Sequence, residues 1–196
     1  GIKPGRRRQR FLGLLEERSE VVDLMKRLIP ATCAAATSQP MPALDLNALR
    51  RFAFLMPYYG IADSDRLRIM ALLGKEISRK FRPLTPVAKR SEDRLRVGYI
   101  SYNFGDHPIG HLLSPFFEAH DRRKTELFLY STNRRDHDRS GYPGRLRRAA
   151  NRYRDMAGET HISIAQTIHA DSLDILIDLD GYLAGGRPEV LAQRPA

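Results

Sequence analysis

The N-terminal part of the chain carries apolar residues at helical spacing. Between Phe11 and Ile29 they recur at intervals of three and four positions, which predicts an amphipathic helix that Pro30 ends. A second helix is predicted to begin at a cap, Asp45, and to stop at Pro57.

A third helix is predicted to begin at Asp63 or Ser64 and to stop before Pro83. Its inward face is predicted to hold Leu67, Met70, Ala71, Ile77 and Phe81. We therefore expect residues 1–82 to form a helical lead-in region, in the manner of the end of a helical solenoid.

Beyond a proline-punctuated, charged connector at 83–93, short apolar runs alternate with helical segments. Strands are predicted at Leu95–Ser101, Glu126–Ser131 and Asp174–Leu179, and helices at Pro108–His120, Tyr142–Asn151 and Ile162–Ala170. This alternation is typical of right-handed crossovers between parallel strands. The sequence therefore predicts an α/β fold with a Rossmann-like parallel sheet over residues 94–196.

The loop after the first predicted strand holds the first candidate for chemistry, because ligands bind at the carboxyl ends of parallel strands. Pro108 favours the first helical position, so His107 is predicted to be the N-cap residue. The positive end of the helix dipole there favours a neutral imidazole, which can accept a proton. Asp106 is expected either to orient this ring or to cap the helix. A surface or capping role for His107 without catalysis stays open.

Two further histidines are candidates. His111 follows His107 by four positions, but neither the general-base Glu of an HExxH motif nor a third ligand accompanies the pair. We therefore expect a partly buried helix histidine and no metal site. His169 lies near the end of a predicted helix, where it is either functional or a cation at the negative end of the dipole.

The last predicted strand ends in a second group of candidates: Asp178, Asp180, Gly181 and Tyr182. Side chains alternate along a strand, so only one of the two aspartates can point toward the first loop, and the other is expected to serve a turn or a cap. Another proline-started helix is predicted from Pro188. We expect the two strand ends to face one cleft.

Charge and composition narrow the classes of protein. The chain has 33 Lys and Arg against 23 Asp and Glu, a net charge of +10, and its arginines cluster near the N-terminus and between Arg122 and Arg154. Such clusters bind phosphates or form a solvated face, and they lack the interleaved aromatic residues that stack on bases. No apolar run is long enough to span a membrane. Cys33 is the only cysteine, which excludes an internal disulfide and favours the cytoplasm.

Three segments together carry a resemblance to a known family: RLRVGYISYNFGDHPIGHLL, IHADSLDILIDLDGY and GGRPEVLAQRPA. In this order they resemble the N-terminal half of the catalytic region of the O-linked N-acetylglucosamine transferase and SPINDLY family, glycosyltransferase family 41. The segment MPYYGIADSDRLRIMALLGKEISRKF is similar to the part of the family that joins a tetratricopeptide array to the catalytic region.

The resemblance implies the N-terminal half of a GT-B glycosyltransferase, without the C-terminal Rossmann domain that binds the donor. It implies a metal-independent, inverting enzyme that transfers a sugar, N-acetylglucosamine from UDP-GlcNAc, to Ser or Thr of protein acceptors, with no cofactor beyond the donor and no membrane partner. UDP-glucose and GDP-fucose, which relatives use, stay open as donors. We expect the 196 residues alone to lack substantial activity.

The resemblance also assigns residues. His107 matches the active-site histidine of the family, and the substrate-binding positions are expected to be Asp106, Pro108, His111, His169, Asp180, Gly181 and Tyr182. The alternative is a non-catalytic basic α/β module that binds either nucleic acid or an acidic protein partner. The lack of aromatic residues between the arginines disfavours nucleic acid.

Overall fold

The computed structural model describes residues 54–86, 93–133, 141–183 and 185–196, together with residue 50 and parts of 20–31. The chain forms two compact units, residues 1–76 and 77–196, and the division falls within one helix. The predicted cap Asp45 lies outside the described residues.

Two prolines in the first unit, Pro30 and Pro57, lie in or beside helical turns near the predicted helix ends. The described part of 20–31 is helical and includes Pro30 and Ala31. Around Pro57 the chain continues as a 3-10 helix, η1 (Met56–Tyr59), which ends at Gly60 with φ of 66°. The α-helical residues before Pro57 thus end at position 55, within two positions of the predicted stop, while the helix at Pro30 includes at least one further residue because proline has the φ of a helix.

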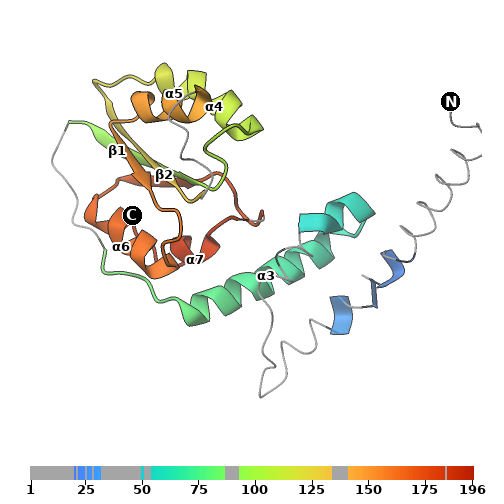
Figure 1. Cartoon of the computed structure of the whole chain (residues 1–196). Helices are drawn as coiled ribbons and strands as arrows, with labels where there is room; N and C mark the ends of the chain where they lie inside the picture. The colour runs from blue at the N-terminus through green and yellow to red at the C-terminus, as the bar shows by residue number, and fades with distance from the viewer. Residues whose placement is uncertain are drawn as a thin grey trace, which may run out of the picture. The chain divides into compact units, whose positions relative to one another are not determined.

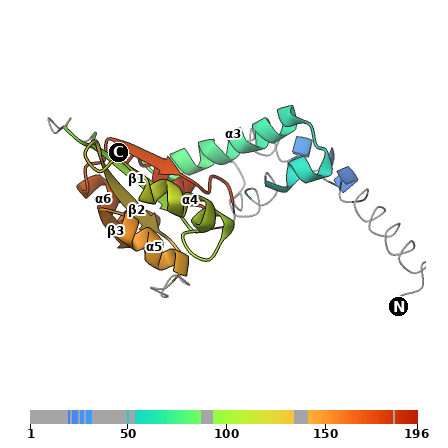
Figure 2. The ribbon, with the colours of Figure 1, turned by 90° about the horizontal axis from the view of Figure 1, so that it is seen from above.

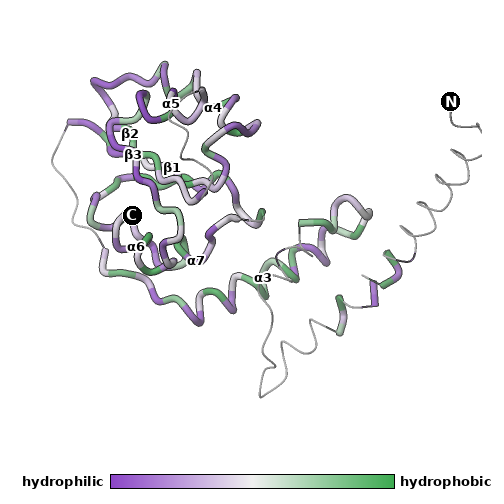
Figure 3. The backbone as a smooth tube through the Cα atoms, in the orientation of Figure 1, coloured by the Kyte–Doolittle hydropathy of each residue, from purple (hydrophilic) through white to green (hydrophobic). Residues whose placement is uncertain are grey.

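Helix α3 (Asp63–Lys80) begins where predicted. Its buried apolar residues are Ile69, Leu73 and Ile77, four positions apart, and hydrophilic and hydrophobic residues alternate along it (Figure 3). The predicted inward residue Leu67 is 63% exposed. At 100° per residue, Leu67 lies about 200° around the helix from Ile69, so the two cannot share the buried face. Ala71 is exposed for the same reason.

The second unit contains the predicted parallel sheet. Its strands are β1 (Leu95–Ser101), β2 (Thr125–Ser131), β3 (Arg152–Asp155) and β4 (Ile175–Asp178). Their order is β3-β2-β1-β4, all neighbouring pairs are parallel, and the first three lie side by side (Figure 2). The α/β prediction is therefore confirmed.

Helices cover both faces of the sheet (Figure 1). On one face lie α4 (Pro108–Glu118) and α5 (Gly141–Ala149), and on the other α6 (His161–Ala170) and α7 (Pro188–Leu191). Phe117 of α4 and Leu146 of α5 pack against alternate residues of β1 and β2, and Ile164 and Ile168 of α6 pack against the intervening ones. This alternation produces one core on each face.

Strand β3 was not predicted. Its four residues, Arg-Tyr-Arg-Asp, have no apolar alternation because it is an edge strand whose arginines form ion pairs. At the start of the predicted connector, the Leu84 amide donates to the Gln193 carbonyl at 2.7 Å. Among the described residues, none of the helices has the length and apolar character that a membrane span requires.

Candidate active site at the ends of β1 and β4

The predicted candidates of the first and last strands follow two neighbouring parallel strands. Ile100 of β1 pairs in register with Asp178 of β4, so the loops that follow both strands leave the same edge of the sheet. This edge is where ligands bind in open parallel sheets.

Asp180 connects the two loops. Its carboxylate is buried and accepts hydrogen bonds from the Ser101 hydroxyl at 2.9 Å, the Asn103 side-chain amide at 2.8 Å and the backbone amide of Tyr102. Three hydrogen-bond donors at the end of β1 thus bind one carboxylate that follows β4. These bonds hold the first loop to the end of β4, and the substrate contact expected of Asp180 stays a prediction.

Asp178 serves its own turn, as expected for one of the two aspartates. It accepts from the amides of Asp180 at 3.0 Å and Gly181 at 3.1 Å. Burial raises the pKa of Asp178, and the charge of Asp180 adds to this while the two amide bonds oppose it. Gly181 has a φ of 53°, so the turn uses the left-handed conformation that glycine favours.

Two glycines allow close approach of the loops. A Cβ at Gly185, where φ is 93°, would lie 2.5 Å from the Tyr102 ring. A Cβ at Gly110, in α4, would lie 2.1 Å from the carbonyl oxygen of Gly105. The chain around His107 is therefore folded back tightly on the first turn of its helix.

His107 is the N-cap of α4, as predicted. Its Nδ1 accepts a hydrogen bond of 3.2 Å from the Ile109 amide, Pro108 occupies the first turn, and the His107 carbonyl accepts from the His111 amide at 3.0 Å. The side chain is exposed at the carboxyl edge of the sheet.

One expectation about its neighbours was wrong. Asp106 does not orient His107; it pairs with His111, whose Nε2 lies 2.6 Å from the Asp106 carboxylate. His111 is partly covered, as expected: its side chain is 41% exposed and stacks on Tyr142 with ring centroids 3.9 Å apart. The first turn of α4 points this ring toward the start of α5, a contact that helical spacing alone does not reveal. The part of the chain that the structure describes holds no cluster of three or more metal-ligating side chains.

The structure does not bring His169 to this group. Helix α6 ends at Ala170, and Asp171 follows at the opposite edge of the sheet, where its carbonyl accepts from the Arg96 side chain near the start of β1. Tyr182 is half-buried in the loop after β4. Tyr142, Ser101 and Asn103 belong to the site region although sequence reasoning missed them. The signals were the place of Ser101 and Asn103 at or after the end of the first predicted strand and of Tyr142 at the start of a predicted helix.

The comparison with a protein-family description decides the assignment. The description of glycosyl transferase family 41 matches residues 72–196, which include both strand ends and all of the candidates. The chain belongs to glycosyltransferase family 41.

Relatives in the family agree with this. The chain is 37% identical over 103 residues to the probable UDP-N-acetylglucosamine–peptide N-acetylglucosaminyltransferase SEC of Arabidopsis thaliana. The matched region covers 53% of this chain and 10% of that protein. It is 35% identical over 104 residues to the corresponding enzyme of Caenorhabditis elegans, covering 53% of this chain and 9% of that protein. An O-GlcNAc transferase of Thermobaculum terrenum, solved as a mutant, superposes with a TM-score of 0.71 at 26% identity, over 88% of this chain and 32% of that one. The chain therefore matches about a tenth of the length of these curated relatives.

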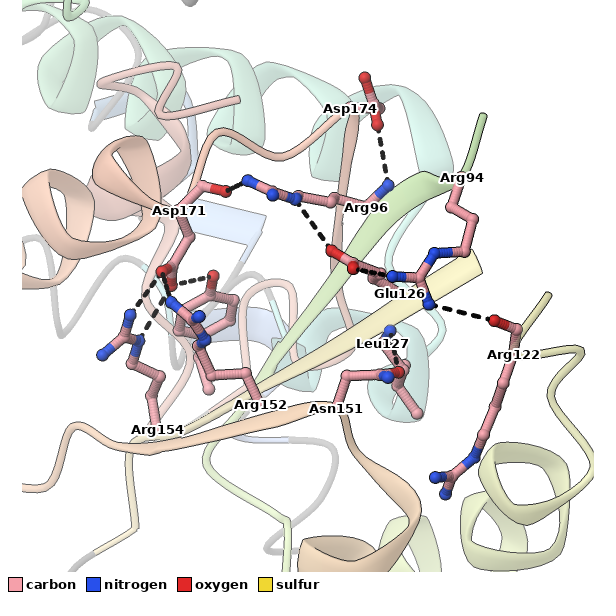
Figure 4. Close-up of polar contacts among 11 residues, drawn as sticks. Arg94, Arg96, Arg122, Glu126, Leu127, Asn151, Arg152, Arg154, Asp171 and Asp174 are labelled. Carbon is pink, nitrogen blue, oxygen red and sulfur yellow. Dashed lines mark hydrogen bonds and ion pairs between the residues drawn. The ribbon is translucent and has the colours of Figure 1, made fainter. Parts of the chain in front are cut away.

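The arginine cluster of this family 41 chain gathers around Glu126 of β2 and Asp171, which follows α6 (Figure 4). Arg152 and Arg154 pair with the buried Asp171, and Arg94 and Arg96 pair with Glu126. These four guanidinium groups are bound to carboxylates of the fold.

Asp171 is the centre of this cluster. Burial alone would raise the pKa of its carboxyl, but hydrogen bonds from Arg154 and Tyr130 and the charges of Arg154 and Arg152 lower it below the usual range. Burial and the bond to Asp171 raise the pKa of the Tyr130 hydroxyl. This network joins β2, β3 and the end of α6, so it is part of the scaffold.

Proposed function

We propose that this chain is the acceptor-side part of an inverting protein glycosyltransferase that moves N-acetylglucosamine from UDP-GlcNAc to Ser or Thr of proteins. The observation that carries the proposal is the family match over residues 72–196, which contains the two strand-end loops that Asp180 holds together. The named activities of the relatives from Arabidopsis and Caenorhabditis elegans support the donor and the peptide acceptor.

The reaction makes two demands on the site. An acceptor oxygen must reach the anomeric carbon from the side opposite the leaving group, and the departing diphosphate must be stabilised. His107 lies exposed at the end of β1, and Tyr182 lies in the adjoining loop. We propose that His107 contacts the substrates directly and that Asp106, Pro108, His111, Gly181 and Tyr182 shape their surroundings. Asp180 acts through the loop that it holds, and His169 lies outside this group.

We propose that the remaining donor contacts come from a second Rossmann-like domain of the complete protein, that no metal cofactor is needed, and that the protein works in the cytoplasm. UDP-GlcNAc is the proposed donor, with UDP-glucose and GDP-fucose as the alternatives that the family resemblance leaves open. The acceptor is a protein segment, because the relatives are named for transfer to peptides.

The test is a transfer assay with the complete protein, a Ser- and Thr-containing peptide library and each of the three donors, read by mass spectrometry. We expect a mass increase of one N-acetylhexosamine with UDP-GlcNAc, unchanged in excess chelator. Transfer of only a hexose or a deoxyhexose would show that the donor is UDP-glucose or GDP-fucose instead. Absence of transfer with all three donors would refute the proposed transferase activity.

The second candidate, a basic module that binds nucleic acid or an acidic protein, is less well supported. The described arginines that would bind phosphate, among them Arg94, Arg96, Arg152 and Arg154, are already paired with carboxylates. A nucleic-acid partner would show affinity that falls steeply with salt. We expect no such binding.

A further inference from the structure

The loop that carries His107 contains a tight turn with Asp106 at its centre. The His107 amide donates to the Gly105 carbonyl at 2.9 Å, so Asp106 is the middle residue of a three-residue turn. The Asp106 side chain is 88% exposed, and its carboxylate lies 2.6 Å from Nε2 of His111. This contact ties the turn to the first turn of α4.

A side chain from α5 holds the His111 ring in place. Tyr142 lies against His111 with ring centroids 3.9 Å apart and an interplanar angle of 28°, which is a stacked pair. A histidine that is 41% exposed on a helix surface has several rotamers within reach unless a neighbour excludes them. The stack with Tyr142 therefore favours the orientation in which Nε2 meets Asp106.

A second contact fixes Tyr142 from the other end of α4, which lies beside α5 (Figure 1). The Arg145 guanidinium lies 5.5 Å from the centre of the Tyr142 ring and donates to both carboxylate oxygens of Glu118, at 2.8 and 2.6 Å. Glu118 follows His111 by seven positions, or about two helical turns, so both lie on the face of α4 toward α5. Tyr142 and Arg145 thus attach α5 to this face at two points.

We propose that Tyr142 is a positioning residue for the transfer reaction. Through His111 and Asp106 it fixes the turn that carries His107. The effect on transfer rests on the proposed function, whereas the contacts themselves do not. Tyr142 comes from the segment that follows β2, so a third strand end contributes to the site that the ends of β1 and β4 form.

This contact complements the one made by Asp180. The Asp180 carboxylate holds the start of the first loop, at the Tyr102 amide and the Asn103 side chain. Tyr142 holds the end of the same loop, at Asp106, where the chain enters α4. The loop is thus fastened at both ends by elements distant from it in the sequence.

Kinetics of the complete protein test the role of the Tyr142 ring. Tyr142→Leu keeps an apolar side chain but loses the stacking ring, so we expect kcat for peptide transfer to fall about tenfold and KM for UDP-GlcNAc to stay within about twofold. Tyr142→Phe should restore most of this kcat, because the ring and not the hydroxyl contacts His111.

Tyr153→Leu is the matched control. The Tyr153 ring packs on Arg147 of α5, whose guanidinium carbon lies 4.1 Å from the ring centre, and this pair makes no contact with Asp106 or His111. We expect its kcat to stay within about twofold of wild type. Equal kcat in Tyr142→Leu and Tyr153→Leu, or a Tyr142→Phe variant as slow as Tyr142→Leu, would overturn the proposal.

A double variant tests the route through Asp106. If Tyr142 acts through the Asp106 carboxylate, removing that carboxylate leaves Tyr142 with nothing to position. Asp106→Ala and the double variant Asp106→Ala with Tyr142→Leu should therefore have the same kcat. Losses that multiply in the double variant would show that Tyr142 acts by another route, which would overturn the proposal.

Hydrogen exchange separates this proposal from the proposed function. Mass spectrometry of the complete protein follows a peptide that contains the amides of His107 and His111, which donate to the carbonyls of Gly105 and His107. We expect exchange there to be about tenfold faster in Tyr142→Leu and unchanged in Tyr142→Phe. Unchanged exchange in Tyr142→Leu would overturn the positioning role. A wild-type protein that transfers no sugar would instead refute the proposed function, and exchange would still show whether Tyr142 holds the turn.

Discussion

The side-chain amide nitrogen of Asn103 lies 2.8 Å from the carboxylate of Asp180, although 77 positions separate the two residues. One follows β1 and the other follows β4, so this bond joins the two loops that carry the candidate site. The position of His107 relative to Tyr182 therefore depends on the buried carboxylate of Asp180, which accepts hydrogen bonds from the first loop.

Asp180→Ala tests this connection. The change leaves the donors of Ser101 and Asn103 without their acceptor, which we expect to cost about 2–4 kcal/mol of unfolding free energy. Loosening of the loop should lower kcat by about tenfold to a hundredfold, with a smaller change in KM. Chemical denaturation and steady-state kinetics of the complete protein measure both.

Asp155→Ala is the matched control for that variant. Asp155 ends β3, and its carboxylate accepts a local bond from Ala157 at the same edge of the sheet. We expect its kcat to stay within about twofold of wild type because it does not connect the two loops. Equal losses of kcat in the two variants would show that Asp180 has no special positioning role.

Gly110→Ala should displace the loop that carries His107, because Gly110 packs directly against Gly105 of that loop. The added Cβ would lie 2.1 Å from the Gly105 carbonyl oxygen, so the backbone must move. We expect unfolding free energy to fall by about 1–3 kcal/mol and kcat to fall with it. Thermal unfolding and the peptide transfer assay measure the two effects.

Gly74→Ala provides the contrasting case. Gly74 lies within α3, and a Cβ there meets nothing within 4 Å. Alanine should stabilise the helix by about 0.5–1 kcal/mol and leave transfer unchanged. A Gly110→Ala variant as stable and as active as Gly74→Ala would contradict the close contact with Gly105.

Asp171→Asn tests the scaffold on the opposite edge. Removing the charge leaves Arg152 and Arg154 beside a neutral group, which we expect to cost about 2–4 kcal/mol at pH 7. Because the pKa of Asp171 is lower in the folded protein, its contribution is complete above the ordinary range of aspartate and is lost as pH falls through the lowered pKa.

The measurement is urea unfolding of wild type and Asp171→Asn between pH 7 and pH 3. The gap in unfolding free energy should narrow as the pH falls below about 4. A gap that stays constant, or widens in acid, would show that the ion pairs of Asp171 do not stabilise the fold.

Strong local patterns allowed much of the fold to be predicted. Strand β1 has the predicted bounds, Leu95–Ser101, because its apolar run is buried on both faces. His107 was predicted as an N-cap because Pro108 specifies the first turn of its helix. Strand β3 escaped prediction because its charged residues are stabilised by Asp171, which lies elsewhere in the sequence.

Distant partners account for what could not be predicted at the site. That Asp106 pairs with His111, and that His111 stacks on Tyr142, depends on how α4 and α5 pack. The bonds of Asp180 depend on the register between β1 and β4. Periodicity places a residue on a face of its own element but does not select its partner on another.

The most direct test of the account is kcat/KM for transfer of N-acetylglucosamine from UDP-GlcNAc to a Ser- and Thr-containing peptide, compared between the complete wild-type protein and its His107→Ala variant. We predict a loss of at least about a hundredfold, with the folded state confirmed by circular dichroism. A variant that keeps the wild-type kcat/KM would contradict the placement of the active site at the end of β1.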